Sequence, residues 1–528
     1  MAALLVALPW INPAAYGPSA AAIPWLVSAA SVLALWGVAS RGFRLQLVPP
    51  VLAWLAAATV LWAALSQFTV RPELAMLAGG LAVVVLAVAV ARNAELACAL
   101  QAGLLAAAAV NALFGFVQYF GGSAALSPVV NLTVPGEIYG NLRQTNQFAT
   151  LCWMGAAIVL FGTLHLPRAA ATTLLVLLAA ACAATGSRTG VLEGIALATL
   201  AAWWRGPERR GRLVLAGIAA VAYVSAALLL PLLLEAATGI ASDRTLWARL
   251  GAGDPCISRR VLWSNVLHLV ALKPLAGWGW GELDYAHFLT LYPGARFCEI
   301  LDNAHNLPLH LAVELGAPAA LLACGGALFW AWRQRPWAEA VPLRRLAWVV
   351  LALVLLHSLL EYPLWYGPFQ IAAGLALGWL LPVAAAAVVV PRRGAAAAVL
   401  LGAALAYAAF DYARVSQAYI EPEARWRPWR KDTLKQVRAS WLFSGQARFA
   451  DFTLATPTRA NAQEMYALSQ QVLHYSPEPR VIEGAIESAV LAGREDEALL
   501  HLVRFRAAFP AEYENWRARQ RQPLPAAP

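Results

Sequence analysis

Long apolar stretches separated by short polar intervals run through the first 410 residues of the chain. Most are close to the roughly 17–25 residues with which an α-helix crosses the hydrocarbon core of a bilayer. The pattern predicts an all-α fold with about 12–13 transmembrane helices. The apolar stretches are 2–16, 20–40, 46–66, 74–91, 95–119, 148–165, 169–185, 189–204, 213–234, 306–332, 346–366, 368–390 and 394–410.

Two polar segments interrupt or follow the apolar pattern, and they divide the chain into four parts. Residues 1–234 form a first membrane block, 235–305 a large loop, 306–410 a second membrane block and 411–528 a polar C-terminal domain. The loop is the one long polar interval between predicted spans, so it is a natural place for chemistry at a membrane face.

The polar C-terminal domain shows helical periodicity of its own. From Pro479 onward apolar residues recur with helical spacing, and Gly493 falls where a turn is needed. This pattern predicts a helical hairpin resembling one tetratricopeptide-type unit, although such arrays normally hold about three repeats. A solvated helical cap and a partner-binding module both fit the pattern.

Composition supports the membrane interpretation. The chain is 60% hydrophobic and 13% charged, with a mean hydropathy of +0.60, whereas soluble proteins average about 25% charged residues. It is therefore expected to be a polytopic integral membrane protein. The N-terminal apolar run lacks a basic leader and a small-residue cleavage pattern, so it is interpreted as a retained first span.

Basic residues orient the predicted spans, because Lys and Arg accumulate in short cytoplasmic loops. On this rule the loops 120–147, 186–188 and 235–305 lie outside, together with everything after residue 411. The net charge of +10 partly reflects this bias, and no nucleic-acid partner is expected. The inside loops carry Arg41, Arg44, Arg92, Arg168, Arg205, Arg209, Arg210, Arg212, Arg333, Arg335, Arg344, Arg345, Arg392 and Arg393.

The six cysteines fall into two groups. Cys256 and Cys298 lie in the outside loop, where an oxidising compartment would let them form a disulfide. The chain has no CxxC or HExxH spacing, so no metal site is expected. The remaining four lie in apolar spans and are interpreted as packing residues: Cys98, Cys152, Cys182 and Cys324.

The outside loop ends with a polar run around His305, and this run is the strongest candidate for chemistry. An imidazole at a membrane edge can transfer protons to and from a substrate that stays anchored in lipid. Asp302, Asn303 and Asn306 are close enough in sequence to orient it or to contact substrate. His310 lies about 140° further round the predicted helix, so it is expected to pack or support rather than share the reacting atom.

Two arginines are candidates for binding an anion. Arg260 lies on a predicted amphipathic helix with Trp263, and a guanidinium can bind phosphate oxygens through two hydrogen bonds. Arg188 lies in the tight outside turn 185–190, against the topological bias for basic residues. An interfacial anchor for Arg260 and snorkelling to lipid headgroups for Arg188 are the competing interpretations.

The segment that leads into the predicted span 148–165 is rich in amide side chains. Asn141, Arg143, Gln144 and Asn146 suit sugar hydroxyls or a polar lining, but they also suit a helix cap.

Three other polar features have structural interpretations. The glycine string 277–281 lacks the strand and helix of a nucleotide site and is interpreted as a flexible aromatic turn. His357 and Glu361 are four residues apart on one predicted helix face and are expected to form a structural hydrogen bond. Asn111 and Glu193 are the main polar residues inside predicted spans.

Six motifs in order resemble the O-antigen ligase/polymerase superfamily. They are GNLRQTNQFAT at 140–150, SRTG at 187–190, RVLW at 260–263, GWGWG at 277–281, AHNLPLHLAVELG at 304–316 and LEYPLWYGPF at 360–369. The first and last narrow the resemblance to the bacterial protein O-oligosaccharyltransferase (PglL-like) branch. The C-terminal domain contributes much less.

This resemblance implies a function. Proteins of the branch transfer a glycan from undecaprenyl diphosphate to a hydroxyl acceptor, at the periplasmic face of the bacterial inner membrane, without metal or cofactor. By motif position, Arg188 and Arg260 would bind the diphosphate and His305 would be the general base. A protein acceptor such as pilin is expected, with inversion at the anomeric carbon.

Other activities share this chemistry or this membrane architecture. An O-antigen ligase that uses lipid A core is the nearest alternative, and a polysaccharide polymerase is the next. A transporter of lipid-linked glycan would place ionisable residues at mid-bilayer, whereas those of this chain concentrate at the outside ends.

Overall fold

The computed structural model describes residues 1–40, 50–67, 72–241, 255–381 and 391–521. In these ranges the regular secondary structure is helical and no strand occurs. Together with the apolar helices, this confirms the prediction of an all-α polytopic membrane protein. Arg41 and Arg44, and residues 242–254 of the predicted loop, lie outside the described residues.

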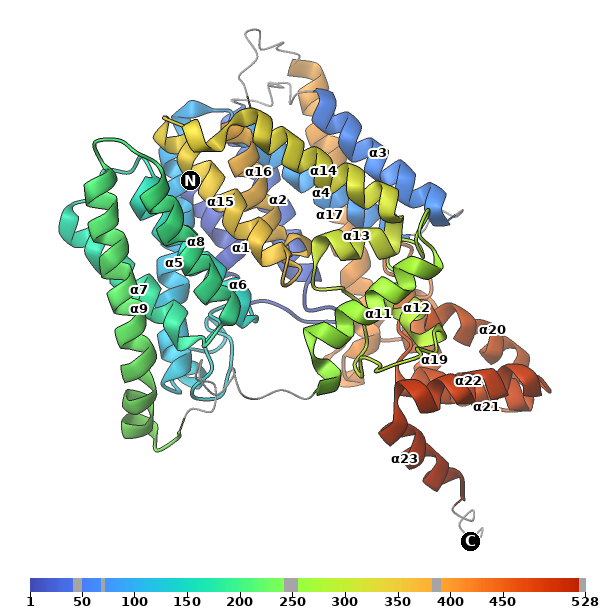
Figure 1. Cartoon of the computed structure of the whole chain (residues 1–528). Coiled ribbons are helices and arrows are strands. Elements are labelled where there is room, and N and C mark those ends of the chain that lie inside the picture. The colour runs from blue at the N-terminus through green and yellow to red at the C-terminus, as the bar shows by residue number, and fades with distance from the viewer. Residues whose placement is uncertain (41–49, 68–71, 242–254, 382–390, 522–528) are drawn as a thin grey trace. The chain divides into compact units, whose positions relative to one another are not determined.

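The chain forms two compact units (Figure 1). Unit 1 comprises Met1–Thr59, Leu77–Ala252 and Ala327–Tyr407, and unit 2 comprises Val60–Met76, Gly253–Gly326 and Ala408–Pro528. Four helices are divided between the units: α3 (Pro50–Gln67), α4 (Pro72–Ala91), α14 (Ala317–Gln334) and α17 (Pro391–Ser416).

Unit 1 is a bundle of apolar helices around one hydrophobic core. Within it α7 packs along α9, and α1 packs along α5. Its own helices are α1 (Ala2–Ile11), α2 (Ala22–Ala39), α5 (Ala97–Tyr119), α6 (Thr145–Phe161), α7 (Arg168–Ala184), α8 (Arg188–Trp203), α9 (Arg209–Thr238), α15 (Pro342–Ser358) and α16 (Gly367–Leu380).

Five helical segments among the described residues are long and apolar enough to cross a membrane on length and composition alone. They are Ala22–Ala39, Pro72–Ala91, Ala94–Tyr119, Arg209–Thr238 and Gly394–Tyr419. Five shorter apolar helices accompany them. The number of 12–13 crossings therefore stays a prediction.

Two predicted stretches differ from the helices that form. The stretch 306–332 is broken at Gly316, whose φ of +90° interrupts the helix between α13 and α14. The stretch 346–366 ends at Ser358, so Glu361 lies beyond the helix that carries His357, and the expected shared helix face is wrong. Pro363 disfavours helical backbone just before it, which fits the early end of α15.

Unit 2 has two hydrophobic clusters. One lies among helices of the predicted loop and α13, and the other lies mainly in the C-terminal helices. The predicted hairpin is present as α21 and α22, with Gly493 at φ +72° in the turn. The helices of unit 2 are α11 (Arg259–Leu272), α12 (Leu283–Leu289), α13 (Leu307–Leu315), α18 (Thr433–Val437), α19 (Ser444–Thr453), α20 (Ala462–Leu473), α21 (Pro479–Leu491), α22 (Glu495–Ala508) and α23 (Pro510–Arg521).

Candidate functional site

His305 lies immediately before the N-cap of α13, and its backbone has an uncommon conformation. Its φ of +48° is in the left-handed region, which non-glycine residues rarely adopt. Asn306 caps α13 by accepting the backbone N–H of Leu309 at 3.1 Å. Left-handed residues persist only where their surroundings hold them, and they cluster at functional sites. The conformation therefore makes His305 a candidate functional residue.

Three side chains hold the backbone around His305. Asn303 is buried, and its Oδ1 accepts the His305 backbone N–H at 2.9 Å. The Trp263 indole N–H donates to the Ala304 carbonyl at 3.1 Å. The Ala304 N–H donates to His310 Nδ1 at 3.4 Å. Because the peptide units before His305 are bonded from several directions, its position is well defined within unit 2.

His310 has the supporting place that the sequence suggested. It is buried, with Nε2 3.3 Å from the Glu314 carboxylate. Since Nδ1 accepts the Ala304 N–H, a neutral ring carries its proton on Nε2 and donates it to Glu314. His310 thus supports the backbone that precedes His305.

Asp302 is an electrostatic neighbour of both imidazoles. The protein around its carboxyl displaces water and raises the Asp302 pKa, and His305 and His310 partly offset this rise. The Asp302 carboxyl is therefore within electrostatic range of His305 and His310.

The glycine string 277–281 is bonded to the end of α13. The N–H of Trp278 donates to the Val313 carbonyl at 2.8 Å, and the N–H of Gly279 donates to the Glu314 carbonyl at 3.0 Å. A Cβ on Gly316 would lie 2.1 Å from the Leu275 carbonyl oxygen. The expected aromatic turn is present, but its backbone is bonded to α13 rather than free.

Arg260 is exposed on α11, one turn before Trp263. Ser258 caps this helix, and its Oγ accepts the Val261 N–H at 3.4 Å. The buried face of α11 carries Leu262 and Val266 and packs in the cluster of unit 2 that also contains Ala304. The helix that presents Arg260 is thus fixed to the segment that carries His305.

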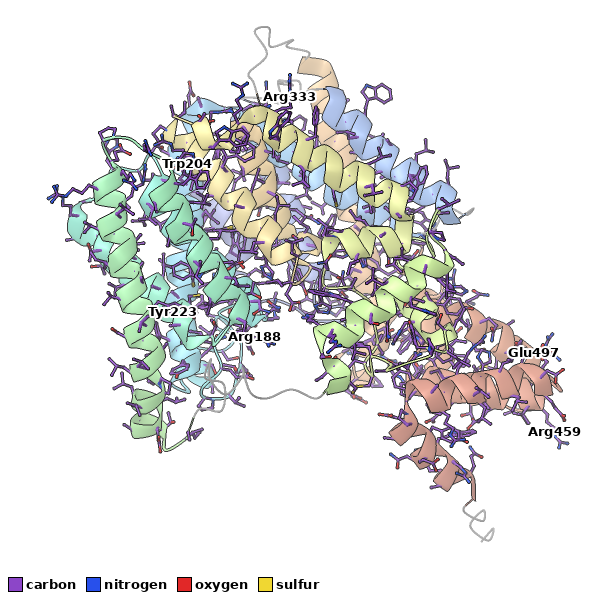
Figure 2. The ribbon with its side chains drawn as sticks, in the orientation of Figure 1. Arg188, Trp204, Tyr223, Arg333, Arg459 and Glu497 are labelled. Atoms are coloured by element: carbon purple, nitrogen blue, oxygen red, sulfur yellow. A yellow bond between two sulfur atoms is a disulfide. The ribbon has the colours of Figure 1, made fainter. Side chains whose placement is uncertain are left out.

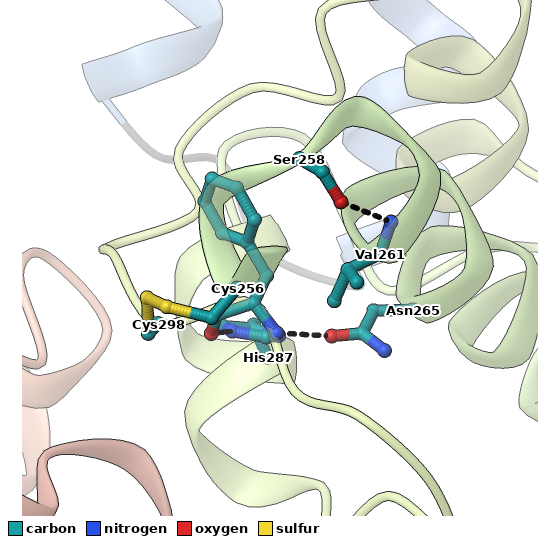
Figure 3. Close-up of a disulfide and its surroundings, with 7 residues drawn as sticks. Cys256, Ser258, Val261, Asn265, His287 and Cys298 are labelled. Carbon is teal, nitrogen blue, oxygen red and sulfur yellow. Dashed lines mark hydrogen bonds between the residues drawn. A yellow bond between two sulfur atoms is a disulfide. The ribbon is translucent and has the colours of Figure 1, made fainter. Parts of the chain in front are cut away.

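A disulfide between Cys256 and Cys298 closes the loop around α11 and α12 (Figure 3). The two Cα atoms are 5.6 Å apart, a usual separation for such a bond. Next to it, Asn265 Oδ1 accepts the Phe297 N–H at 2.8 Å, and His287 Nε2 lies 3.0 Å from the Phe297 carbonyl. These bonds connect the segment that contains Phe297 and Cys298 to α11 and α12.

Arg188 belongs to unit 1 and is the first residue of α8 (Figure 2). Its side chain is exposed, while Thr185 and Ser187 in the same turn are buried. The Ser187 hydroxyl caps the helix by accepting the Gly190 N–H at 3.0 Å. A guanidinium next to the positive end of a helix dipole is an arrangement that attracts anions.

The amide-rich segment of unit 1 divides into structural and open positions. Asn141 is buried, donates to the carbonyls of Ile11 and Val129, and accepts the Asn131 N–H, so its side chain is engaged within the fold. Gln144 caps α6 by accepting the Gln147 N–H at 2.6 Å. This is the capping role that the sequence left open.

Arg143 and Asn146 have different surroundings. Arg143 is half-buried at φ +60° and donates to the Pro13 carbonyl. Partial burial lowers its pKa, and Tyr139 opposes that shift. It lines a cavity of about 140 Å³ with Asn12, Gln144 and Tyr366, among others. Asn146 instead bonds to Ser187, in the turn that precedes Arg188.

Comparison with protein families found three matches. Residues 138–161 match the family described as protein glycosylation ligase, 173–324 match O-antigen ligase, and 345–523 match the C-terminal part of virulence factor membrane-bound polymerase. These matches support the resemblance to the O-antigen ligase and protein glycosylation ligase superfamily that the motifs indicated. Comparison with curated proteins found no match.

The O-antigen ligase match contains all three residues singled out for the reaction: Arg188, Arg260 and His305. The two ligase families indicate a glycosyl-transferring enzyme. The match at 345–523 extends the likeness into the C-terminal helices, where the sequence motifs gave little. Sequence reasoning also missed the support that Trp263 gives to Ala304, although Trp263 stands inside one of the motifs.

Proposed function

We propose that the chain is a bacterial protein O-oligosaccharyltransferase of the inner membrane. It transfers a glycan en bloc from undecaprenyl diphosphate to Ser or Thr hydroxyls of periplasmic or pilin-like proteins. The observation that carries the proposal is His305, held in a left-handed backbone by Asn303, Trp263 and His310 within an O-antigen ligase match. The protein glycosylation ligase match at 138–161 supports the protein acceptor.

His305 acts as the general base of a single displacement. Its imidazole takes the proton of the acceptor hydroxyl while the oxygen attacks the anomeric carbon. The bond between that carbon and the diphosphate oxygen breaks, and undecaprenyl diphosphate leaves with the electron pair. Attack opposite the leaving group inverts the anomeric centre, and Asp302 or Asn303 orients the imidazole.

Arg188 and Arg260 stabilise the diphosphate. Negative charge grows on its oxygen as the glycosidic bond breaks, and guanidinium groups fixed in advance favour that charge. Both side chains are exposed at the first turn of a helix. Neither the proton transfer to His305 nor the departure of the diphosphate requires a metal ion or cofactor.

Substitution of His305 tests the chemistry. We expect His305→Ala to lower transfer by about 10²–10⁴-fold, the usual contribution of a general base, while the protein still folds and binds the lipid-linked donor. His268→Ala on α11 is a matched histidine control. Unchanged transfer by a folded His305→Ala protein would exclude the base role.

The acceptor is tested separately, because the O-antigen ligase match at 173–324 favours lipid A core as a second candidate. Purified enzyme and undecaprenyl diphosphate glycan are incubated with pilin-like protein, with lipid A core, or with a second lipid-linked glycan. We expect only the protein to become glycosylated. Modification of lipid A core alone indicates an O-antigen ligase, and chain growth on the donor indicates a polymerase.

A further inference from the structure

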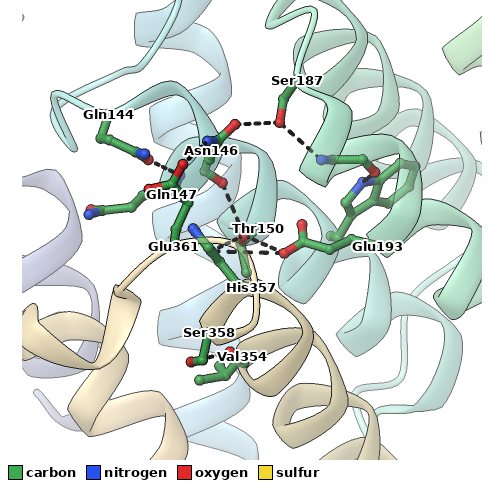
Figure 4. Close-up of polar contacts among 12 residues, drawn as sticks. Gln144, Asn146, Gln147, Thr150, Ser187, Glu193, Val354, His357, Ser358 and Glu361 are labelled. Carbon is green, nitrogen blue, oxygen red and sulfur yellow. Dashed lines mark hydrogen bonds and ion pairs between the residues drawn. The ribbon is translucent and has the colours of Figure 1, made fainter. Parts of the chain in front are cut away.

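Three buried side chains meet inside unit 1, where α6, α8 and α15 pack together (Figure 4). Thr150, Glu193 and His357 come one from each helix, and each has 0% of its surface exposed. Thr150 Oγ1 lies 2.6 Å from Glu193 Oε1 and 2.7 Å from His357 Nδ1. The same hydroxyl lies 3.0 Å from the Asn146 carbonyl.

The hydroxyl of Thr150 has one proton, so it donates to only one of these three neighbours. If it donates to His357 Nδ1, then Glu193 must present a proton to the hydroxyl oxygen. If it donates to Glu193, then His357 must carry a proton on Nδ1. If it donates to the Asn146 carbonyl, then both Glu193 Oε1 and His357 Nδ1 must carry a proton. Every arrangement that forms these bonds therefore requires either the acid form of Glu193 or a proton on Nδ1 of His357, which one tautomer of the neutral imidazole carries.

Burial selects among these arrangements. Glu193 Oε2 and His357 Nε2 have no hydrogen-bond partner within the described part of the chain. A buried carboxylate with one oxygen that lacks a hydrogen-bond partner costs far more than a neutral acid. We propose that Glu193, Thr150 and His357 form a proton-binding site, in which the Glu193 acid donates to Thr150 and Thr150 donates to His357 Nδ1.

Within the described ranges of the chain, the ionisable groups that act on Glu193 and His357 do not supply a compensating positive charge. Cys152 on α6 and Cys182 on α7 are electrostatic neighbours of Glu193, and Glu361 is a neighbour of His357. None of these three is a cation at neutral pH. The neutral acid is thus the form that this environment favours.

The site is linked to the turn that carries Arg188. Asn146, one turn before Thr150 on α6, accepts the Ser187 hydroxyl at 2.6 Å and donates to Glu361 at 3.2 Å. Ser187 in turn caps α8, which carries both Arg188 and Glu193. Through these contacts the hydrogen bonds of the proton-binding site help to hold the first turn of α8 in place. Glu193, Thr150 and His357 are therefore positioning residues for Arg188. This part rests on the proposed function of Arg188 in donor binding.

Infrared spectroscopy of the full-length protein tests the proton directly. We expect the difference between wild type and Glu193→Gln to show the carbonyl stretch of a protonated carboxylic acid, persisting up to pH 9. Thr150→Val removes the acceptor of the acid proton and should shift that band to higher frequency, whereas Thr150→Ser should leave it in place. A difference spectrum that contains only carboxylate bands overturns the proposal, as does a band unaffected by Thr150→Val.

Kinetics with the lipid-linked donor test the link to Arg188. Removal of one buried hydrogen-bonding hydroxyl in Thr150→Val should raise the donor KM about tenfold, with a smaller change in kcat and recovery in Thr150→Ser. Ser358→Ala is the matched control, because its buried hydroxyl bonds only to the Val354 carbonyl of its own helix in the bonds described. An unchanged donor KM in Thr150→Val overturns the positioning role. Absence of transfer in wild type would instead refute the proposed function and leave the infrared result standing.

Discussion

Trp263 illustrates how a residue that need not touch substrate can set the position of one that does. Its indole N–H is bonded to the carbonyl that precedes His305. Trp263→Phe keeps most of the ring and removes this hydrogen bond, which is worth about 0.5–1.5 kcal/mol. We expect kcat for glycan transfer to fall by up to about tenfold, because His305 is positioned less well, with little change in donor KM.

The matched control for this experiment is Trp441→Phe, since Trp441 is 54% exposed in the C-terminal domain. Steady-state kinetics with varied donor separate kcat from KM. An equal loss in both variants, or a loss confined to KM, would contradict a positioning role for Trp263.

His287 gives the loop next to the disulfide a predictable sensitivity to acid. Burial, with a contribution from Arg296, lowers the His287 pKa from 6.5 to about 3. The unfolded chain therefore takes up a proton on this residue as the pH falls below about 6.5, whereas the folded chain stays neutral. Stability from this group is complete above pH 6.5 and is lost as the pH falls towards 3, by about 2 kcal/mol at pH 5.

Substitution of His287 tests whether this residue lowers the stability of the protein as the pH falls. His287→Gln retains a donor for the Phe297 carbonyl but does not titrate, so we expect its unfolding temperature to fall less than that of wild type between pH 7.5 and pH 5. Thermal unfolding in detergent measures both proteins. Parallel pH profiles would show that His287 does not control the acid response.

At the scale of elements, the break between α13 and α14 is the feature that gives the His305 segment its anchor. Gly316 has φ +90°, and a Cβ there would overlap the Leu275 carbonyl. We expect Gly316→Ala to lower the free energy of unfolding of unit 2 by at least about 1–3 kcal/mol and to reduce transfer. Gly326→Ala in α14 meets no atom within 4 Å and serves as the control. Similar thermal unfolding of the two variants would contradict this assignment.

The positions of most helices follow from the sequence because apolar length is a local property. The break at Gly316 does not, since it depends on the close approach of the distant Leu275 backbone. For the same reason the motifs that contain His305 and Trp263 could be found, whereas the hydrogen bond from Trp263 to the Ala304 carbonyl could not. The hydrophobic pattern says that a helix forms, but it does not say which carbonyl its side chains will reach.

At the scale of the whole molecule, the C-terminal helices share a hydrophobic core with the loop. Phe288 of α12 belongs to the same cluster as Phe449 and Phe505. His474 of α20 lies 2.6 Å from the Glu282 carboxylate, across 192 residues of sequence. A tail with an independent core could be lost without effect on the loop, but this arrangement predicts that the loop depends on it.

Truncation of the chain tests this dependence. Deletion of residues 462–521 would expose the α12 face that carries Phe288 and leave Glu282 without its His474 partner. Because α12 packs against α11 and the latter carries Arg260 and Trp263, we expect loss of glycan transfer and faster proteolysis of the 255–305 region. A chain ending at Arg521 keeps the whole cluster and should behave as wild type. If the deletion variant transfers glycan normally and its loop resists protease, then the shared core stabilises only the tail, and the match at 345–523 must reflect another role.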